Sequence, residues 1–139
     1  MALQNCVILL RVRYSETDQM GTFSNACALE WFECGRTEWL RQAGVCYAQA
    51  EQRGMFLPLV EAHLEFLGRA RYDDQLEITT AAGMAGKARL RFDLQIVHAQ
   101  GRSGVVRGYT VHAFADASGK AIRPPAWFLK ALQNDRSGA

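Results

Sequence analysis

The chain of 139 residues is 49% hydrophobic and 22% charged, and its formal net charge is +2. This length predicts a single domain over residues 1–139, and the composition is typical of a globular protein with an apolar core. The small net charge does not favour a nucleic-acid partner. The apolar run at residues 7–10 is too short for a signal peptide or a membrane span, so we expect a cytoplasmic protein without membrane contact.

The first half of the chain predicts a strand, a loop and a helix, in that order. Residues 6–15 are apolar or β-branched and then alternate with arginine, which favours a strand with one solvated face. Residues 16–25 are polar and contain a glycine, as loops do. The next segment predicts a helix of about five turns, because apolar residues recur every three or four positions, at Leu29, Phe32, Trp39, Leu40 and Ala43. Ser24 or Asn25 suits its N-cap, and Gly44 suits the position just past its end.

The second half predicts four strands and a short helix. Strand-like residues fill positions 59–72, 75–82, 87–100 and 105–117, and polar or glycine-containing turns separate them. Pro124 and Pro125 end the last strand, and residues 126–132 are compatible with a terminal helix. One long helix among five strands, without crossover helices, indicates an α+β fold in which the sheet wraps around the helix.

Three motifs around the predicted loop and helix resemble those of a known family. They are RYSETDQMG at residues 13–21, WFE at residues 31–33 and RTEWL at residues 36–40. Together with VEAH at residues 60–63 and RARYDD at residues 69–74, they resemble the 4-hydroxybenzoyl-CoA thioesterase family over most of the chain. The resemblance implies a hotdog fold, in which a five-stranded antiparallel sheet surrounds a long central helix. It also implies an acyl-CoA thioesterase without a cofactor, with active sites at the interface of a homodimer, often within a homotetramer.

The resemblance also assigns the reacting groups. The family's catalytic aspartate falls on Asp18, which Gly21 follows as in the family motif, and the oxyanion donor, a backbone N–H at the helix start, falls on Asn25. Many members carry tyrosine and histidine where this chain has Ser24 and Asn25, so no role of that histidine is transferred. The Asp18 carboxylate is able to attack the thioester carbonyl or to take a proton from the attacking water, and both roles stay open. The N–H groups of Asn25 and Ala26 would bind the oxyanion.

We expect the substrate to lie beside this loop. The candidate contacts there are Gly21, Phe23, Ser24 and Trp31, with Phe56 as a further wall of an acyl pocket. The acyl group is not determined, because aromatic, short aliphatic and long-chain acids each need only a differently shaped pocket.

Further candidates fall on the predicted strands. His63 shares a strand face with Glu61 and Glu65, so it either faces the substrate or is hydrogen-bonded at a subunit interface. Three cations share one face of the strand at residues 87–100, namely Lys87, Arg89 and Arg91. They either hold the CoA phosphates or are solvated charges, and Arg102 and Arg107 are rival phosphate contacts.

Two other functions stay open. The acyl group could be carried by acyl carrier protein rather than CoA, which would require a basic docking surface at the mouth of the cleft. The alternative from a different class is a non-catalytic hotdog protein that binds acyl-CoA, since one fold hosts many functions. The three histidines lack closely spaced carboxylates, so no metal site is predicted, and the four cysteines, without CxxC spacing, are expected to be reduced thiols.

Overall fold

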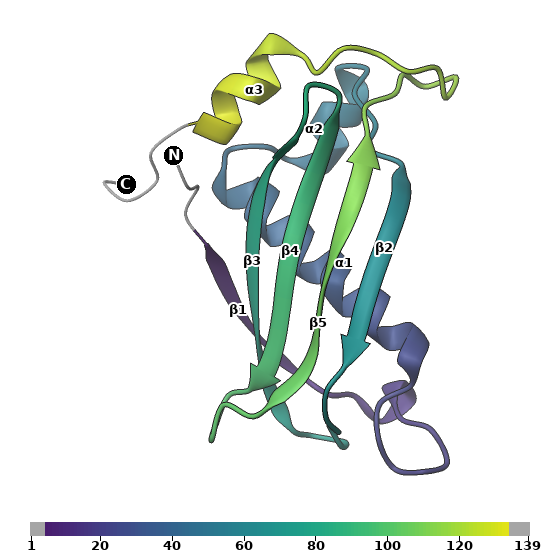
Figure 1. Ribbon diagram of the computed structural model, residues 1–139, viewed down its shortest axis with the longest axis vertical. Coiled ribbons are helices and arrows are strands. Elements are labelled where there is room, and N and C mark those ends of the chain that lie inside the picture. Colours follow the sequence, from purple (N-terminus) through teal and green to yellow (C-terminus); the bar gives the residue numbers. More distant parts are fainter. Residues whose placement is uncertain (1–4, 134–139) are drawn as a thin grey trace.

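One antiparallel sheet packs across α1 (Asn25–Gln42) in the computed structural model, which describes residues 5–133 (Figure 1). Its strands are β1 (Cys6–Arg11), β2 (Leu59–Phe66), β3 (Gln75–Ala85), β4 (Arg89–His98) and β5 (Gly104–Ala113). The strand order is β1-β3-β4-β5-β2, so β1 and β2 form the two edges, and every neighbouring pair is antiparallel. The predicted α+β class and five-stranded antiparallel sheet are confirmed.

Short helical segments connect or follow these elements. A 3-10 turn, η1 (Tyr14–Glu16), lies between β1 and the loop before α1, which is why the first strand ends at Arg11 and not at Ser15. α2 (Tyr47–Gln52) follows α1, and α3 (Ala126–Gln133) follows the last strand near the predicted terminal helix. The second strand ends at Phe66 and not at Tyr72, because the chain then turns so that the carbonyl of Ala70 accepts the N–H of Phe23 at 2.9 Å.

The β3–β4 hairpin turns later than the sequence predicted. β3 continues to Ala85 rather than ending at Ala82, and Gly86, with a φ of +77°, begins the turn. Only glycine adopts such a φ without steric cost. As a result Lys87 lies in the turn and not on β4, so the predicted row of three cations on one strand is wrong at its first position.

The contact between α1 and the sheet is close near the middle of the helix. A Cβ on Gly35 would lie 2.5 Å from Oγ1 of Thr80 on β3, so only glycine fits at this approach. Trp31, Phe32 and Trp39 are fully buried against the sheet, whereas Leu29, which the periodicity placed among the packed residues, is 38% exposed. Gly44, with a φ of +87°, follows the helix as predicted.

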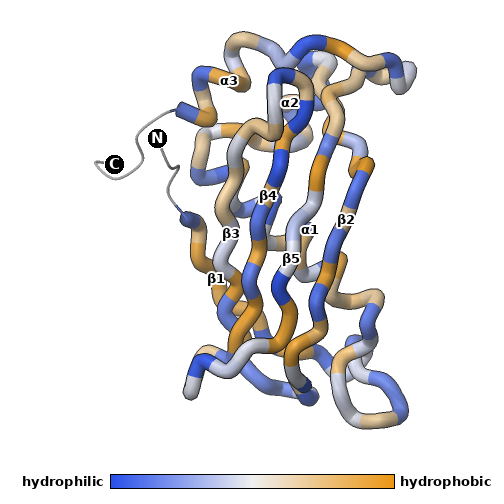
Figure 2. The backbone as a smooth tube through the Cα atoms, in the orientation of Figure 1, coloured by the Kyte–Doolittle hydropathy of each residue, from blue (hydrophilic) through white to orange (hydrophobic). Residues whose placement is uncertain are grey.

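The two faces of the sheet differ in polarity. Hydrophobic and hydrophilic residues alternate along β2 and β4 (Figure 2), and the buried residues of β4, Leu90, Phe92 and Leu94 among them, face α1. Arg91 and Asp93 therefore lie on the outer face, which α1 does not cover. Within residues 5–133 every helix is too short or too polar to cross a bilayer, and no disulfide joins the cysteines.

Candidate active site

Asp18 begins a tight turn in the loop before α1. Its N–H donates to the carbonyl of Thr22 at 2.8 Å, and its carbonyl accepts the N–H of Gly21 at 3.0 Å. Gly21 has a φ of +79°, and the Oδ1 atom of Asp18 accepts the N–H of Met20 at 2.8 Å. A bridge between Thr17 and Phe23 closes this turn. The Asp18 carboxylate therefore accepts one backbone N–H, while the backbone of Asp18 is fixed in the turn and the side chain is exposed to solvent.

Glu16 fixes the loop relative to α1. Its side chain is buried, and its Oε2 atom accepts the indole N–H of Trp31 at 3.0 Å. Its carboxylate also accepts the backbone N–H of Arg13 at 2.7 Å and the guanidinium of Arg13 at 3.2 Å. The carbonyl of Glu16 accepts the N–H of Ser24 at 2.7 Å, so both ends of the segment that contains Asp18 are bound. Sequence reasoning missed this role, although Glu16 and Trp31 both lie in the quoted motifs.

The hydrogen bonds to Glu16 also decide its ionisation. Burial alone would raise the pKa of Glu16, but the hydrogen bonds from Arg13 and Trp31 outweigh it and hold the pKa below its ordinary value. Glu16 is therefore charged at neutral pH. Its oxygens also lie near the Cys27 thiol and the Glu30 carboxylate, and the ligand-type atoms of these three residues all lie within 4.8 Å. Burial raises the pKa of Cys27, and N–H donors already occupy Glu16, so this cluster is poorly suited to a metal ion.

The start of α1 lies directly after this loop and offers donors. Ser24 is the N-cap, but its side chain makes no capping hydrogen bond, while its carbonyl accepts the N–H of Cys27 at 2.9 Å. Among the described residues no acceptor is bonded to the N–H groups of Asn25 and Ala26. These groups and the positive end of the helix dipole are suited to bind an oxyanion near the Asp18 loop.

Phe23 and Trp31, two predicted substrate contacts, lie in the core. They are 4% and 1% exposed, and their ring centroids are 5.0 Å apart. Phe23 also stacks on Phe66, the last residue of β2, at 6.2 Å. In the single chain these rings pack on the buried side of the loop, whereas Gly21 and Ser24 lie at the protein surface. Phe56 pairs with Ala115 and precedes Leu57 at the other end of α1, away from this loop.

His63 and Arg91 lie together on the outer face of the sheet. The rings of His63 and Tyr109 stack at 5.4 Å, and the guanidinium of Arg91 lies 3.9 Å above the Tyr109 ring. His63 Nε2 is 3.6 Å from a Glu65 oxygen, and Arg91 forms an ion pair with Asp93 at 2.9 Å. The hollow that these residues line does not include Asp18.

The predicted basic row is therefore partly neutralised. Arg91 is paired with an acid on its own strand, whereas Arg89 is exposed at the start of β4. The rival phosphate contacts are paired as well, Arg102 with Glu77 at 2.6 Å and Arg107 with Glu65 at 3.1 Å.

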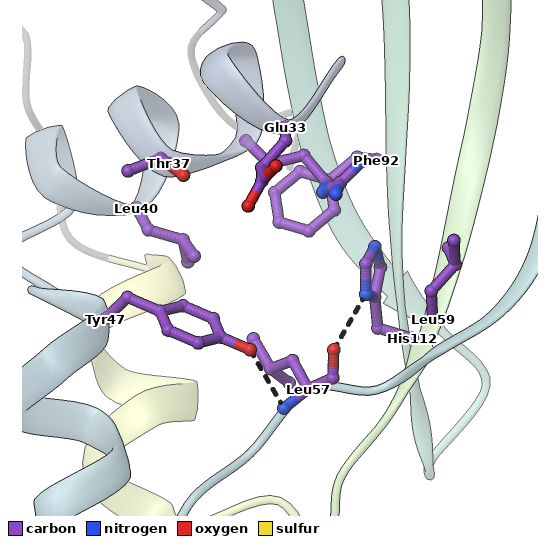
Figure 3. A pocket seen from close by; sticks show the side chains of 9 residues that line it. Glu33, Thr37, Leu40, Tyr47, Leu57, Leu59, Phe92 and His112 are labelled. Carbon is purple, nitrogen blue, oxygen red and sulfur yellow. Dashed lines mark hydrogen bonds between the residues drawn. The ribbon is translucent and has the colours of Figure 1, made fainter. Parts of the chain in front are cut away.

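A cavity of about 320 Å³ lies over the second half of α1, between that helix, α2 and the inner face of β4 and β5 (Figure 3). Leu40, Leu57, Leu59 and Phe92 supply its apolar walls. Its polar groups were not predicted from the sequence; they are Glu33, Arg36, Thr37, Tyr47 and His112.

Two of these polar groups, His112 and Tyr47, are neutral and form hydrogen bonds with the backbone of Leu57. His112 Nδ1 lies 3.1 Å from the Leu57 carbonyl and must donate to it, so Nε2 accepts the hydroxyl of Thr110 at 3.0 Å. Burial lowers the pKa of His112 and raises the pKa of Tyr47, whose hydroxyl accepts the N–H of Leu57 at 3.3 Å. Both rings are therefore uncharged at neutral pH.

Known proteins resemble this chain in sequence. The model of the thioesterase-like superfamily matches residues 12–132. A Bacillus subtilis protein named as a candidate acyl-CoA thioesterase is 34% identical over 71 residues, and the match spans 51% of each chain, about half of that relative's length. A Synechocystis protein named as a candidate esterase is 32% identical over 121 residues, which cover 85% of this chain and 73% of that protein.

The fold agrees with these matches. The crystal structure of a 1,4-dihydroxy-2-naphthoyl-CoA thioesterase from Synechocystis superimposes with a TM-score of 0.85 at 21% identity, covering 93% of this chain and 96% of that one. At this identity the likeness concerns the fold alone. With the family match over nearly all described residues, we conclude that this chain belongs to the thioesterase-like superfamily and has its hotdog fold.

Proposed function

We propose that this protein hydrolyses acyl-CoA thioesters, with Asp18 as the reacting carboxylate. The observation that carries the proposal is the loop that Glu16 holds against α1. It leaves an exposed carboxylate just before a helix start whose first two N–H groups bond to no acceptor within residues 5–133. The Bacillus relative named as a candidate acyl-CoA thioesterase supports the same reaction class.

The chemistry needs few groups because the leaving thiol is acidic. A thiol ionises with a pKa of about 8.5, so the thiolate departs without a strong proton donor. In one route Asp18 takes a proton from water, whose oxygen attacks the carbonyl carbon; in the other Asp18 attacks first and water hydrolyses the resulting anhydride. In both routes the C–S bond breaks, and the N–H groups of Asn25 and Ala26 bind the transient oxyanion.

The proposal includes a homodimer formed through β2. This strand lies at the edge of the sheet, and four large apolar residues at or beside it are about half exposed, namely Leu59, Val60, Phe66 and Leu67. An unpaired apolar edge favours pairing with another strand, and a symmetric dimer pairs β2 with its own copy in antiparallel orientation. Further assembly to a tetramer and a cytoplasmic location stay predictions from the sequence.

Asp18→Asn tests the carboxylate. We expect kcat for thiol release from acyl-CoA to fall by about a thousandfold or more, because an amide neither attacks the thioester nor accepts the proton. Asp116→Asn is the matched control, since Asp116 Oδ1 also accepts an N–H two residues later, from Ser118 at 2.9 Å, in another exposed turn. Turnover of Asp18→Asn close to that of Asp116→Asn would exclude the mechanism.

Asn25→Pro tests the oxyanion donor. Asn25 is the first residue of α1, where proline fits without breaking the helix, and Ser24 already has the extended conformation that precedes proline. The substitution removes one N–H, so we expect a hundredfold to thousandfold lower kcat, on the order measured for loss of one oxyanion donor. Asn25→Ala keeps the N–H and should retain most activity; equal losses in both variants would assign the effect to the side chain.

The same assays separate the remaining functions. Acyl carrier protein as the natural carrier would give faster thiol release from an acyl-carrier thioester than from the CoA thioester of the same acid. A non-catalytic role would give acyl-CoA binding without thiol release in the unmodified protein, and Asp18→Asn would then leave binding unchanged.

A further inference from the structure

The cavity over the second half of α1 contains a cation, Arg36, that forms no ion pair or hydrogen bond among the described residues. Arg36 lines the cavity, and its Nη1 atom is buried without a hydrogen-bond acceptor among the described residues. Glu33 lines the same cavity and its charge acts on Arg36, but its side chain is exposed and does not accept a hydrogen bond from Nη1. A buried donor that lacks an acceptor costs free energy, and more so when it is charged. The Nη1 donor of Arg36 is therefore suited to bind an acidic group of a ligand.

The neutral polar groups of the cavity do not supply an acceptor for Nη1 of Arg36. His112 and Tyr47 are neutral, and both nitrogens of His112 are already bonded within the chain. Tyr47 accepts the N–H of Leu57 with its oxygen, which leaves its own proton to donate. Apart from Glu33 and Thr37, the remaining wall consists of aliphatic and aromatic carbon, as in pockets that bind a small ligand and orient it with a few polar groups.

The dimer of the proposed function would place this cavity beside the reacting carboxylate of the other subunit. Within one chain Arg36 is 11 residues after Asn25, about 16 Å along the helix, so its own Asp18 loop is far away. When all eight residues of β2 pair with their antiparallel copies, Leu59 at the cavity lies beside Phe66 of the partner subunit. Phe66 stacks on Phe23 in the loop of Asp18, so the partner's loop reaches the mouth of the cavity.

We propose, resting on the proposed thioesterase function, that the cavity binds the far end of the acyl group and that Arg36 recognises a second carboxylate there. The substrate class is then the CoA thioester of a dicarboxylic acid. A guanidinium binds a carboxylate through charge-assisted hydrogen bonds, and burial strengthens them. The cavity has the volume of about ten water molecules, room for an acyl group of about five to eight carbon atoms.

The experiment compares adipyl-CoA with hexanoyl-CoA, which have equally long acyl chains. We expect kcat/KM to be at least tenfold higher for adipyl-CoA, and Arg36→Met to abolish this preference by lowering kcat/KM at least tenfold more for adipyl-CoA than for hexanoyl-CoA. Arg36→Lys keeps the charge and should retain part of the preference. Arg41→Met is the matched control, because Arg41 is an exposed cation on the same helix, paired with Glu38.

Calorimetric binding of the free acids separates this inference from the proposed function. Adipate that binds the unmodified protein more tightly than hexanoate, and loses that advantage in Arg36→Met, supports the inference even without thioester hydrolysis. Hydrolysis with equal kcat/KM for the two thioesters would overturn the inference and leave the proposed function intact. An adipyl preference that persists in Arg36→Met would equally overturn the role of Arg36. The absence of both thioester turnover and adipate binding would overturn the inference and the proposed function together.

Discussion

The two ends of α1 present different chemistry. At its first turn the helix offers backbone N–H groups to an exposed loop, where the Asp18 carboxylate accepts the backbone N–H of Met20. Over its second half the helix offers the side chain of Arg36 to a cavity that Glu33, neutral rings and aliphatic carbon line. Backbone donors do not change with side-chain identity, whereas the cavity is built from side chains alone.

This difference suggests how one fold separates reaction from selectivity. The proposed reaction depends on the helix start and one carboxylate, so relatives can share it while their cavities differ. The proposed choice of acyl group depends on residues about 16 Å further along the helix, which substitution can change without disturbing the first turn. The rigid connection between the two ends is α1, packed on β3 through Gly35.

Gly35→Ala should displace α1 from the sheet. The substitution should therefore affect both ends of α1 and have the largest effect on stability. Alanine in a helix normally stabilises by about 1 kcal/mol relative to glycine. Here the new Cβ would lie 2.5 Å from Thr80 Oγ1 and 3.1 Å from side-chain carbons of Ile78 and Leu94. Overpacking costs about 1–3 kcal/mol, so once the helix gain is subtracted we expect a net loss of up to about 2 kcal/mol in urea unfolding.

Thr80→Ala is the partner substitution for this test. It removes the nearest atom, so in a double-mutant cycle Gly35→Ala should cost less in the Thr80→Ala background than in the natural chain. If Gly35→Ala proves as stable as the natural chain, the close approach does not constrain the helix.

The elements of the fold could be predicted because they depend on periodicity. Apolar residues at three- and four-residue steps defined α1, and alternation defined the strands, since both patterns follow from local geometry. Strand ends were less predictable. The first strand ended early because Glu16 bonds to Trp31, 15 residues away, and the β3–β4 turn came late because strand pairing continues to Ala85 opposite Arg89.

The candidate site likewise has a part that could be predicted from the sequence and a part that could not. Asp18 and Asn25 could be assigned because their short spacing follows a motif of the resembled family, and their roles stay predictions. The cavity could not be predicted from the sequence, because its walls come from α1, α2, β4 and β5, which meet only in the folded chain. Nothing local in the sequence shows that Nη1 of Arg36 is buried without an acceptor.

Glu16→Gln should affect the first end of α1 and leave the cavity unchanged. The amide loses the charge-assisted bonds to Arg13 and Trp31, so we expect a loss of about 1–2 kcal/mol at pH 7 and a lower kcat. Because the folded pKa of Glu16 is lowered, its stabilising effect is present above the unfolded value, near 4.5, and disappears as pH falls through the folded value.

Urea unfolding at several pH values below 5 checks this sign. The natural chain should lose stability more steeply than Glu16→Gln as the pH falls. The adipyl preference should be equal in the two proteins, because Glu16 does not line the cavity. Parallel pH curves would contradict the assigned role of the carboxylate.

The smallest expected effect concerns His112 at the second end. Burial lowers its folded pKa, with the nearby Arg36 guanidinium contributing, while the Leu57 carbonyl opposes the shift. The unfolded chain therefore binds a proton more readily, and stability is lost as pH falls below the unfolded value, near 6.5. Two other titratable side chains, Glu33 and Tyr47, line this cavity. Tyr47 stays neutral over the pH range in which His112 titrates.

His112→Gln removes the titrating ring, so the free energy of unfolding should vary less between pH 7 and pH 5 than in the natural chain. His63→Gln, on the outer face of the sheet, controls for the loss of a histidine elsewhere. Should both variants flatten the curve equally, the pH dependence would not come from the cavity. A change confined to His112→Gln would show that a group at the second end of α1 is held neutral by burial, as recognition of a carboxylate by Arg36 alone requires.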